Sequence, residues 1–201
     1  MSILINDANL PATLTTEAMT DEEFAAFCAE HPDLNFEVSA EGEMIIMAPT
    51  HTDTGYSNFE IGGQLRNWAR KNRKGYGGDS STGFVLPNGA RRSPDASWTL
   101  KSRVLKVGAA KRKSFLRLCP DFVIEVKSDS DRLKTLQNKM REYLEQGARL
   151  GWLIDPNNQT IEIYRPDGEV ERREGIDKIK GEGPVEGFVL DLKYVWDPFA
   201  D

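Results

Sequence analysis

The chain has 201 residues, of which 39% are hydrophobic and 29% charged, a composition typical of a globular protein rather than a disordered one. No run of 18 apolar residues occurs, so we expect no membrane-spanning segment, and the first residues do not resemble a secretory signal. Two cysteines are too few for a disulfide framework or a zinc cluster. We therefore expect a reduced, cytoplasmic protein with one domain over residues 1–201.

The net charge of −6 is unevenly distributed along the chain. Residues 1–65 contain 12 acids and no Lys or Arg, whereas residues 66–117 contain 14 Lys or Arg and two acids. Residues 118–149 are balanced, and residues 150–201 contain 12 acids against six bases. The basic central segment either forms a surface that faces phosphates or spreads over solvated faces that the acidic ends neutralise. Both interpretations stay open from the sequence.

The first half of the chain is predicted to contain two helices around a hairpin. Residues 20–30 are predicted to form a short helix, which the capping-box pair Thr20 and Glu23 begins. Two strands follow, around a Glu-Gly turn, in NFEVSAEGEMIIMAP. Apolar residues at helical spacing then predict a longer helix at roughly 53–72.

The second half is predicted to alternate strands with helices. Its expected elements are a hairpin over 82–100 that turns at 87–89, a basic loop or short helix over 101–114, a strand over 121–127, a helix with an apolar stripe from Leu133 to Leu144, and strands over 151–156 and 160–166. This order predicts an α/β fold in which helices pack on a mixed sheet.

The segment PDFVIEVKS, at 120–128, carries the most informative chemistry. Side chains alternate along a strand, so Phe122, Ile124 and Val126 share one face. Glu125 and Lys127 lie on the opposite face. A carboxylate that can bind a metal ion, beside a cation that can face a phosphate, is the raw material of metal-assisted phosphodiester hydrolysis.

A second segment, RRSPDASWTL, supplies a partner carboxylate in Asp95. If its strand pairs with the strand of Glu125, about 4.8 Å away, both carboxylates can bind one divalent cation. Oxygen ligands favour Mg²⁺ or Mn²⁺, and the backbone carbonyl of Val126 is a candidate further ligand. Lys127 would orient the attacking water or stabilise the charge on the phosphate. The alternative is an ordinary strand with Glu125 and Lys127 as a surface ion pair.

The chain resembles the Uma2 group of endonucleases, formerly a domain of unknown function, within the PD-(D/E)xK superfamily. The segments that carry the resemblance are GFVLPNGARRSPDASW, LCPDFVIEVKSDSD, KMREYLEQGARLGWLIDP, IEIYRP and GFVLDL. The resemblance implies a restriction-endonuclease-like mixed β-sheet flanked by α-helices, a divalent-metal site and cleavage of DNA. It also implies that Asp95 and Glu125 bind the metal and that Lys127 is the catalytic lysine.

The resemblance leaves two site positions open. Many members of this group lack a lysine two residues after the glutamate and use one on the next helix, which is Lys139 in this chain. We favour Lys127, because the strand should place it beside Glu125. Nucleases of this superfamily often carry a further glutamate ligand on the preceding helix. Glu60 matches that position, and its alternative is a plain surface glutamate.

Other kinds of site find no support in the sequence. No G-x-S-x-G, P-loop or Rossmann glycine pattern occurs, and histidines and cysteines do not cluster. The leading hypothesis is a Mg²⁺- or Mn²⁺-dependent DNA endonuclease whose basic segment 66–117 contacts the DNA backbone. A homodimer is part of this hypothesis, because one small domain covers little of a duplex. The alternative is a catalytically inactive nuclease-fold module that binds nucleic acid or a protein partner.

Overall fold

The computed structural model of the chain describes residues 12–15, 19–47, 50–108 and 115–200. The helices within these ranges are α1 (Asp21–Glu30), α2 (Thr52–Asn72), α3 (Lys101–Lys106), α4 (Leu133–Glu145), α5 (Lys193–Trp196) and the 3₁₀ helix η3 (Gly183–Val185). Residues 109–114 of the predicted basic loop or short helix lie outside the described part, and α3 forms its beginning. No helix in the described ranges is long and apolar enough to cross a membrane.

The main sheet has six strands, in the order β11 (Val170–Glu174), β10 (Thr160–Tyr164), β9 (Leu150–Asp155), β8 (Phe122–Val126), β7 (Ala96–Leu100) and β4 (Gly75–Asp79). Strands β8 and β9 are parallel, and α4 makes the crossover between them, whereas the other neighbours are antiparallel. Every residue of β8 is buried. The predicted mixed sheet flanked by helices is therefore confirmed.

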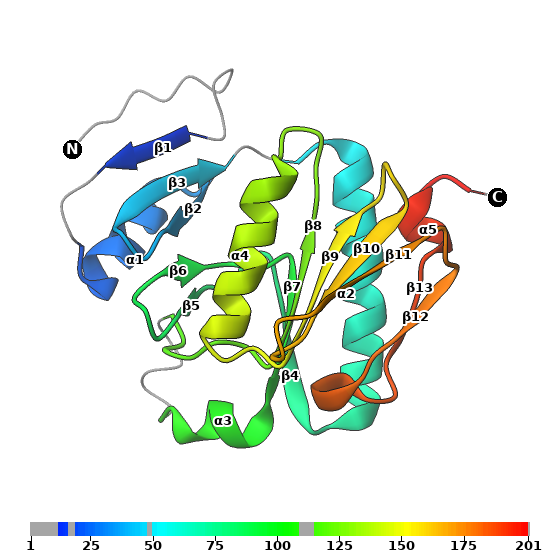
Figure 1. Cartoon of the computed structure of the whole chain (residues 1–201). Helices are drawn as coiled ribbons and strands as arrows, with labels where there is room; N and C mark the ends of the chain where they lie inside the picture. The colour runs from blue at the N-terminus through cyan, green and yellow to red at the C-terminus, as the bar shows by residue number, and fades with distance from the viewer. Residues whose placement is uncertain (1–11, 16–18, 48–49, 109–114, 201) are drawn as a thin grey trace.

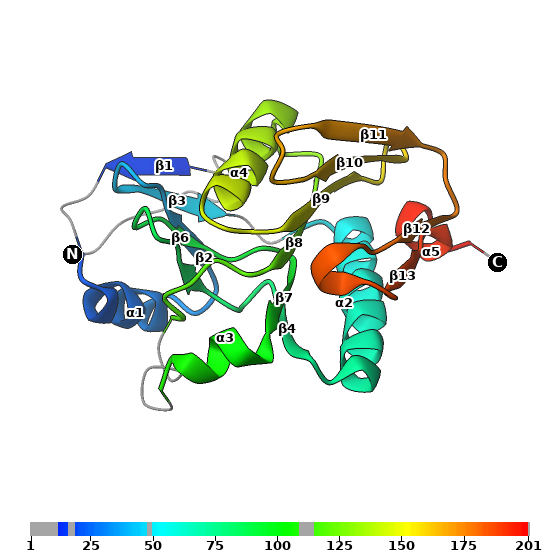
Figure 2. The same cartoon turned by 60° about the horizontal axis from the view of Figure 1, so that its bottom comes forward.

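Helices α2 and α4 cover opposite faces of this sheet (Figures 1 and 2). Phe122, Ile124 and Val126 of β8 belong to the core on the α2 side, while Val123 belongs to the core on the α4 side. The strand alternation that the sequence predicts thus decides which residues face which helix. It directs Glu125 toward α4 rather than toward α2.

A second, antiparallel sheet has the strand order β1 (Ala12–Thr15), β3 (Glu43–Met47), β2 (Asn35–Val38), β6 (Arg91–Arg92) and β5 (Phe84–Val85). Phe36 and Val38 of β2 pack in one core with Phe24 of α1. Glu37, between them, points the other way because of the two-residue period of the strand. This sheet therefore presents a buried carboxylate to the side where α4 lies.

The hairpin predicted over residues 82–100 is divided between the two sheets. Its turn is present, with the backbone N–H of Leu86 donating to the carbonyl of Ala90 at 2.8 Å. However, β5 and β6 are only two residues long, and β7 pairs with β4 and β8 of the main sheet. The chain crosses between the sheets just before β7, and this crossing places Asp95 at the beginning of β7.

The C-terminal segment packs beside α2 on the same face of the main sheet, where Phe188 lies against Trp68 of α2 and stacks on Trp152 of β9. Strands β12 (Lys178–Lys180) and β13 (Val189–Asp191) pair with each other, and both β13 and α5 contact α2. The Ser57 hydroxyl of α2 donates a 2.9 Å hydrogen bond to the carbonyl of Val195. These contacts fix α2 against the sheet and position its inner face beside β7.

Candidate active site

The two predicted carboxylates come together where β7 begins and β8 ends. The antiparallel register pairs Ala96 with Ile124, so one step further along both chains Asp95 lies across from Glu125. The backbone N–H of Val126 donates to Asp95 Oδ2 at 2.8 Å. Glu125 is buried and Asp95 is partly exposed, so solvent reaches the pair from the Asp95 side.

Helix α4 brings Lys139 to this pair. Lys139 Nζ lies 2.9 Å from Glu125 Oε1 and 2.9 Å from Glu37 Oε1, and the lysine side chain is only 11% exposed. Tyr143, one helical turn later, donates its hydroxyl to Glu125 Oε1 at 2.9 Å. Residues four apart share one face of a helix, so α4 presents both groups to Glu125 together.

The Lys127 ammonium group is held by a neighbouring carbonyl. Strand β8 ends at Val126, although the Lys127 backbone N–H still donates to the carbonyl of Ile154 in β9 at 2.8 Å, and the Lys127 Nζ donates to the carbonyl of Ser128 at 3.0 Å. No ion pair in the described part of the chain joins Lys127 to Asp95 or Glu125. The described residues thus show no hydrogen bond or ion pair between the Lys127 ammonium group and either carboxylate, and the role of Lys127 as the site lysine stays a prediction.

Glu60 also lies away from the two carboxylates. Its Oε1 accepts a 2.8 Å hydrogen bond from Gln64 Nε2, and it lines a cavity beside the C-terminal residues Tyr194 and Phe199. Asn58 of α2 reaches the site instead, donating from Nδ2 to Asp95 Oδ1 at 3.0 Å. Two residues along a helix differ in direction by about 200°, so Asn58 and Glu60 cannot face the same group.

The oxygen atoms near Asp95 are of the kinds that bind a divalent cation, although the described residues contain no group of three or more His, Cys, Asp or Glu side chains placed to bind one. Asn58 Oδ1 is buried and has no hydrogen-bond partner in the described part of the chain, although it lies beside Asp95. The N–H and C=O of one strand residue point to the same edge, so the carbonyl of Val126 faces the edge where Asp95 lies. Carboxylate, amide and carbonyl oxygens form a donor set that Mg²⁺ and Mn²⁺ accept.

The electrostatics also favour an added positive charge. Burial raises the pKa of Asp95 from 3.8 to about 6, against the opposing effect of the Val126 hydrogen bond. Burial likewise raises the pKa of Glu125, and repulsion by Asp95 and Glu37 adds to this effect, whereas Lys139 opposes it. A cation between the two carboxylates would restore both to the ionised form.

Glu37 is a site residue that the sequence analysis missed. Burial raises its pKa, but attraction to Lys139 and Arg92 outweighs burial, so its pKa lies below the ordinary value. Its oxygens accept from the Ser93 backbone N–H at 2.8 Å and from Arg92 Nη1 at 3.2 Å. The only signal in the sequence is a charged residue between two core residues of a strand, a pattern that surface strands share.

A cleft of about 1020 Å³ opens between α2 and β4, and Asp95 forms part of its wall. The cations of the basic segment 66–117 fall into two groups, one that lines the cleft and one that forms ion pairs away from it. Four of its cations line the cleft, namely Arg66, Arg70, Arg73 and Lys101. Arg91 and Arg92 instead turn inward, to ion pairs with Asp21 and with Glu37 and Glu142.

Comparison with known proteins places this arrangement in a family. The Uma2 family model, described as "Putative restriction endonuclease", matches residues 21–193. A crystal structure described as a "putative nuclease belonging to DUF820", from Anabaena variabilis, has the same fold with a TM-score of 0.71 at 20% identity, covering 89% of this chain and 98% of that one. Comparison with curated proteins finds no match. Because the family match spans most of its length, the chain belongs to the Uma2 family.

Proposed function

We propose that this chain is a divalent-metal-dependent endonuclease that hydrolyses phosphodiester bonds in DNA. Membership of the Uma2 family supports nuclease activity in general. The observation that carries the specific proposal is the meeting of Asp95 and Glu125 from adjacent strands, with the ammonium group of Lys139 2.9 Å from Glu125. This set of two carboxylates and one lysine matches the needs of metal-assisted phosphodiester hydrolysis.

Asp95 and Glu125, with the carbonyl of Val126, would hold a Mg²⁺ or Mn²⁺ ion. When bound, the ion acidifies water and neutralises charge on the phosphate. Asn58 orients Asp95 through its 3.0 Å hydrogen bond, and its unpaired Oδ1 is available to accept from a water molecule in the site. The Val126 N–H holds the second oxygen of Asp95, so the carboxylate is fixed before any ligand arrives.

Lys139 is the site lysine in this proposal, in place of Lys127. Burial lowers the pKa of Lys139, but attraction to Glu125 and Glu37 outweighs burial and keeps the pKa above its ordinary value. The side chain therefore remains an ammonium ion that donates hydrogen bonds and does not act as a base. It would stabilise the negative charge that builds on the phosphate, a role of preorganised donors in general. Glu37 and Tyr143 fix the groups around it.

A DNA-cleavage assay with purified variants tests the proposal. We expect the parent to cleave DNA with Mg²⁺ or Mn²⁺ and not with a chelator. Asp95→Asn, Glu125→Gln and Lys139→Met should each lose about 100-fold or more in rate, whereas Lys127→Met should stay within about threefold. Circular dichroism checks that each variant is folded. Cleavage by Asp95→Asn at the parental rate would contradict the proposal.

One observation favours the non-catalytic alternative. Glu125 Oε1 already has both Lys139 and Tyr143 as partners, so this oxygen is satisfied without a metal. In a nuclease-fold module that only binds nucleic acid or protein, these two hydrogen-bond partners would be sufficient to stabilise Glu125 in the folded protein. Calorimetry with Mn²⁺ separates the two functions, because the alternative predicts no binding that depends on Asp95. The expected homodimer and the cytoplasmic location stay predictions.

A further inference from the structure

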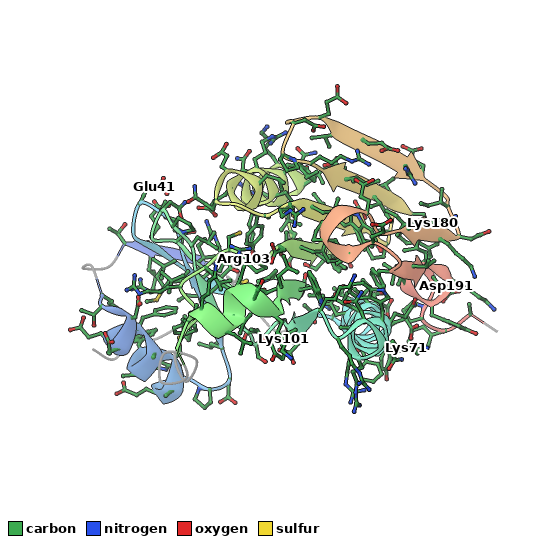
Figure 3. The ribbon with its side chains drawn as sticks, turned by 90° about the horizontal axis from the view of Figure 1, so that it is seen from below. Glu41, Lys71, Lys101, Arg103, Lys180 and Asp191 are labelled. Atoms are coloured by element: carbon green, nitrogen blue, oxygen red, sulfur yellow. The ribbon has the colours of Figure 1, made fainter. Side chains whose placement is uncertain are left out.

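The cleft between α2 and β4 is larger than a metal site requires. Residues of α2 beside its buried face, among them Asn58 and Gly62, form one wall, the glycine-rich strand β4 forms the other, and Asp95 also lines the cleft. Lys101, at the start of α3, also lines the cleft. Figure 3 views the molecule from below and labels Lys101 to one side of α2 and Lys71 to the other. The cleft thus reaches Asp95, one of the two carboxylates.

The charge along the cleft is complementary to a phosphodiester backbone. Arg66, Arg70 and Arg73 line it from α2, and Lys101 lines it from α3. None of these four cations makes an ion pair in the part of the chain that the structure describes. Apart from Asp95, one acid lines the cleft, Asp79, whose Oδ1 accepts hydrogen bonds from its own loop. A row of unpaired cations suits a row of phosphates.

The backbone of α2 keeps this cleft open. Gly62 and Gly63 lie in the middle of the helix on the cleft wall, and a Cβ at either position would meet nothing within 4 Å. Packing therefore does not require glycine, although glycine weakens a helix interior. Arg73 ends α2 in the left-handed conformation, with φ of 58°, where glycine is the usual residue. The two glycines and Arg73 are each unfavourable for the stability of the helix. The glycines leave room for a ligand in the cleft, and Arg73 adds a cation to its lining.

An exposed aromatic ring stands at the mouth of the cleft. Phe59 is 80% exposed and lines both this cleft and a neighbouring cavity of about 410 Å³. The second cavity is also lined by Tyr56, Tyr194 and Phe199. Aromatic rings beside a cationic groove bind single strands, because unpaired bases stack on them. The bases of an intact duplex are already stacked on one another and are not available to such a ring.

We propose that this cleft binds single-stranded DNA. The phosphates lie along Arg66, Arg70, Arg73 and Lys101, and a base stacks on Phe59. A bound strand then brings one of its phosphates to Asp95, the carboxylate on the lining of the cleft. If the chain is a nuclease as proposed, its substrate is then unpaired DNA rather than intact duplex. This consequence rests on the proposed nuclease function.

Binding measured without a metal tests the cleft separately from catalysis. Fluorescence anisotropy in a chelator would compare a labelled oligothymidylate with a labelled duplex of the same length, using the full chain. The variants are Phe59→Ala and the double variant Arg66→Gln/Arg70→Gln. The matched control is Lys71→Gln, because Lys71 is an exposed cation on the same helix that does not line the cleft.

We expect the single strand to bind at least about tenfold more tightly than the duplex, and Phe59→Ala to weaken its binding about tenfold. Removing two phosphate contacts should reduce the slope of log K against log salt by about 1.4, and Lys71→Gln should bind like the parent. Equal or tighter binding of duplex, or parental binding by both cleft variants, overturns the inference. Metal-dependent cleavage with no binding in the cleft would defeat this inference alone, whereas binding without cleavage would defeat the nuclease proposal alone.

Discussion

Replacing Lys139 with methionine removes the charge that two buried carboxylates share. Its Nζ lies 2.9 Å from both Glu125 Oε1 and Glu37 Oε1, while methionine keeps most of the apolar stem. Glu37 retains Arg92 and the Ser93 N–H, whereas among the described residues Glu125 retains the Tyr143 hydroxyl alone. One buried carboxylate is therefore left without a counter-charge.

Lys139→Met should lower the free energy of unfolding by about 3–5 kcal/mol, which is the cost of breaking a buried ion pair. For a chain of this length, that cost lowers the melting temperature by about 6–20 °C. The loss should be larger at pH 8 than at pH 5, because burial raises the pKa of Glu125 and at pH 5 this residue can take up a proton. A neutral Glu125 no longer needs the ammonium group.

Thermal and urea unfolding in a chelator would measure this loss, with Lys127→Met as the matched control. In the described part of the chain, the Lys127 side chain donates to the carbonyl of Ser128 and is partly exposed, so its loss should cost less than about 1 kcal/mol. Equal destabilisation by the two variants, or an unchanged Lys139→Met protein, would refute the assignment of Lys139 to the buried site.

Three further predictions follow from the site and the core. In a chelator, stability should fall from about pH 4 to pH 8, because burial raises the pKa of Asp95 to about 6 and raises that of Glu125, so the folded state binds more protons than the unfolded state. Scanning fluorimetry should then show a larger stabilisation by Mn²⁺ at pH 8 than at pH 5, and equal stabilisation would contradict this. Asn58→Leu should lower Mn²⁺ affinity about tenfold in calorimetry, since it no longer orients Asp95; unchanged affinity would remove Asn58 from the site. Trp152→Ala should cost about 3–5 kcal/mol in urea unfolding, because its ring packs 4.9 Å from Phe122, and yet leave the Mn²⁺ affinity of the folded protein unchanged.

The sequence predicted the sheet and its central strand because these depend on local patterns. Alternation in PDFVIEVKS and the apolar stripe of the following helix determine which faces are buried, and the structure has β8 and α4 at these positions. The hairpin over 82–100 was less predictable. Its residues continue in one strand-like pattern, and nothing local reveals that β7 leaves for another sheet.

The site depended on contacts that lie far apart in the sequence. The sequence favoured Lys127 because it lies two residues after Glu125 on the predicted strand, but its Nζ donates to the carbonyl of Ser128. Lys139 reaches Glu125 because α4 crosses back over the sheet, a tertiary feature. Asn58 and Glu37 come from another helix and another sheet, and a polar residue on such an element is more often solvated than functional.

The central claim is that Asp95 and Glu125 bind one divalent cation. Anomalous scattering from a crystal soaked in Mn²⁺ tests it most directly. The account predicts one strong peak between the two carboxylates, within about 2.0–2.6 Å of an oxygen of each. A crystal with Mn²⁺ bound elsewhere and none between Asp95 and Glu125 would contradict it.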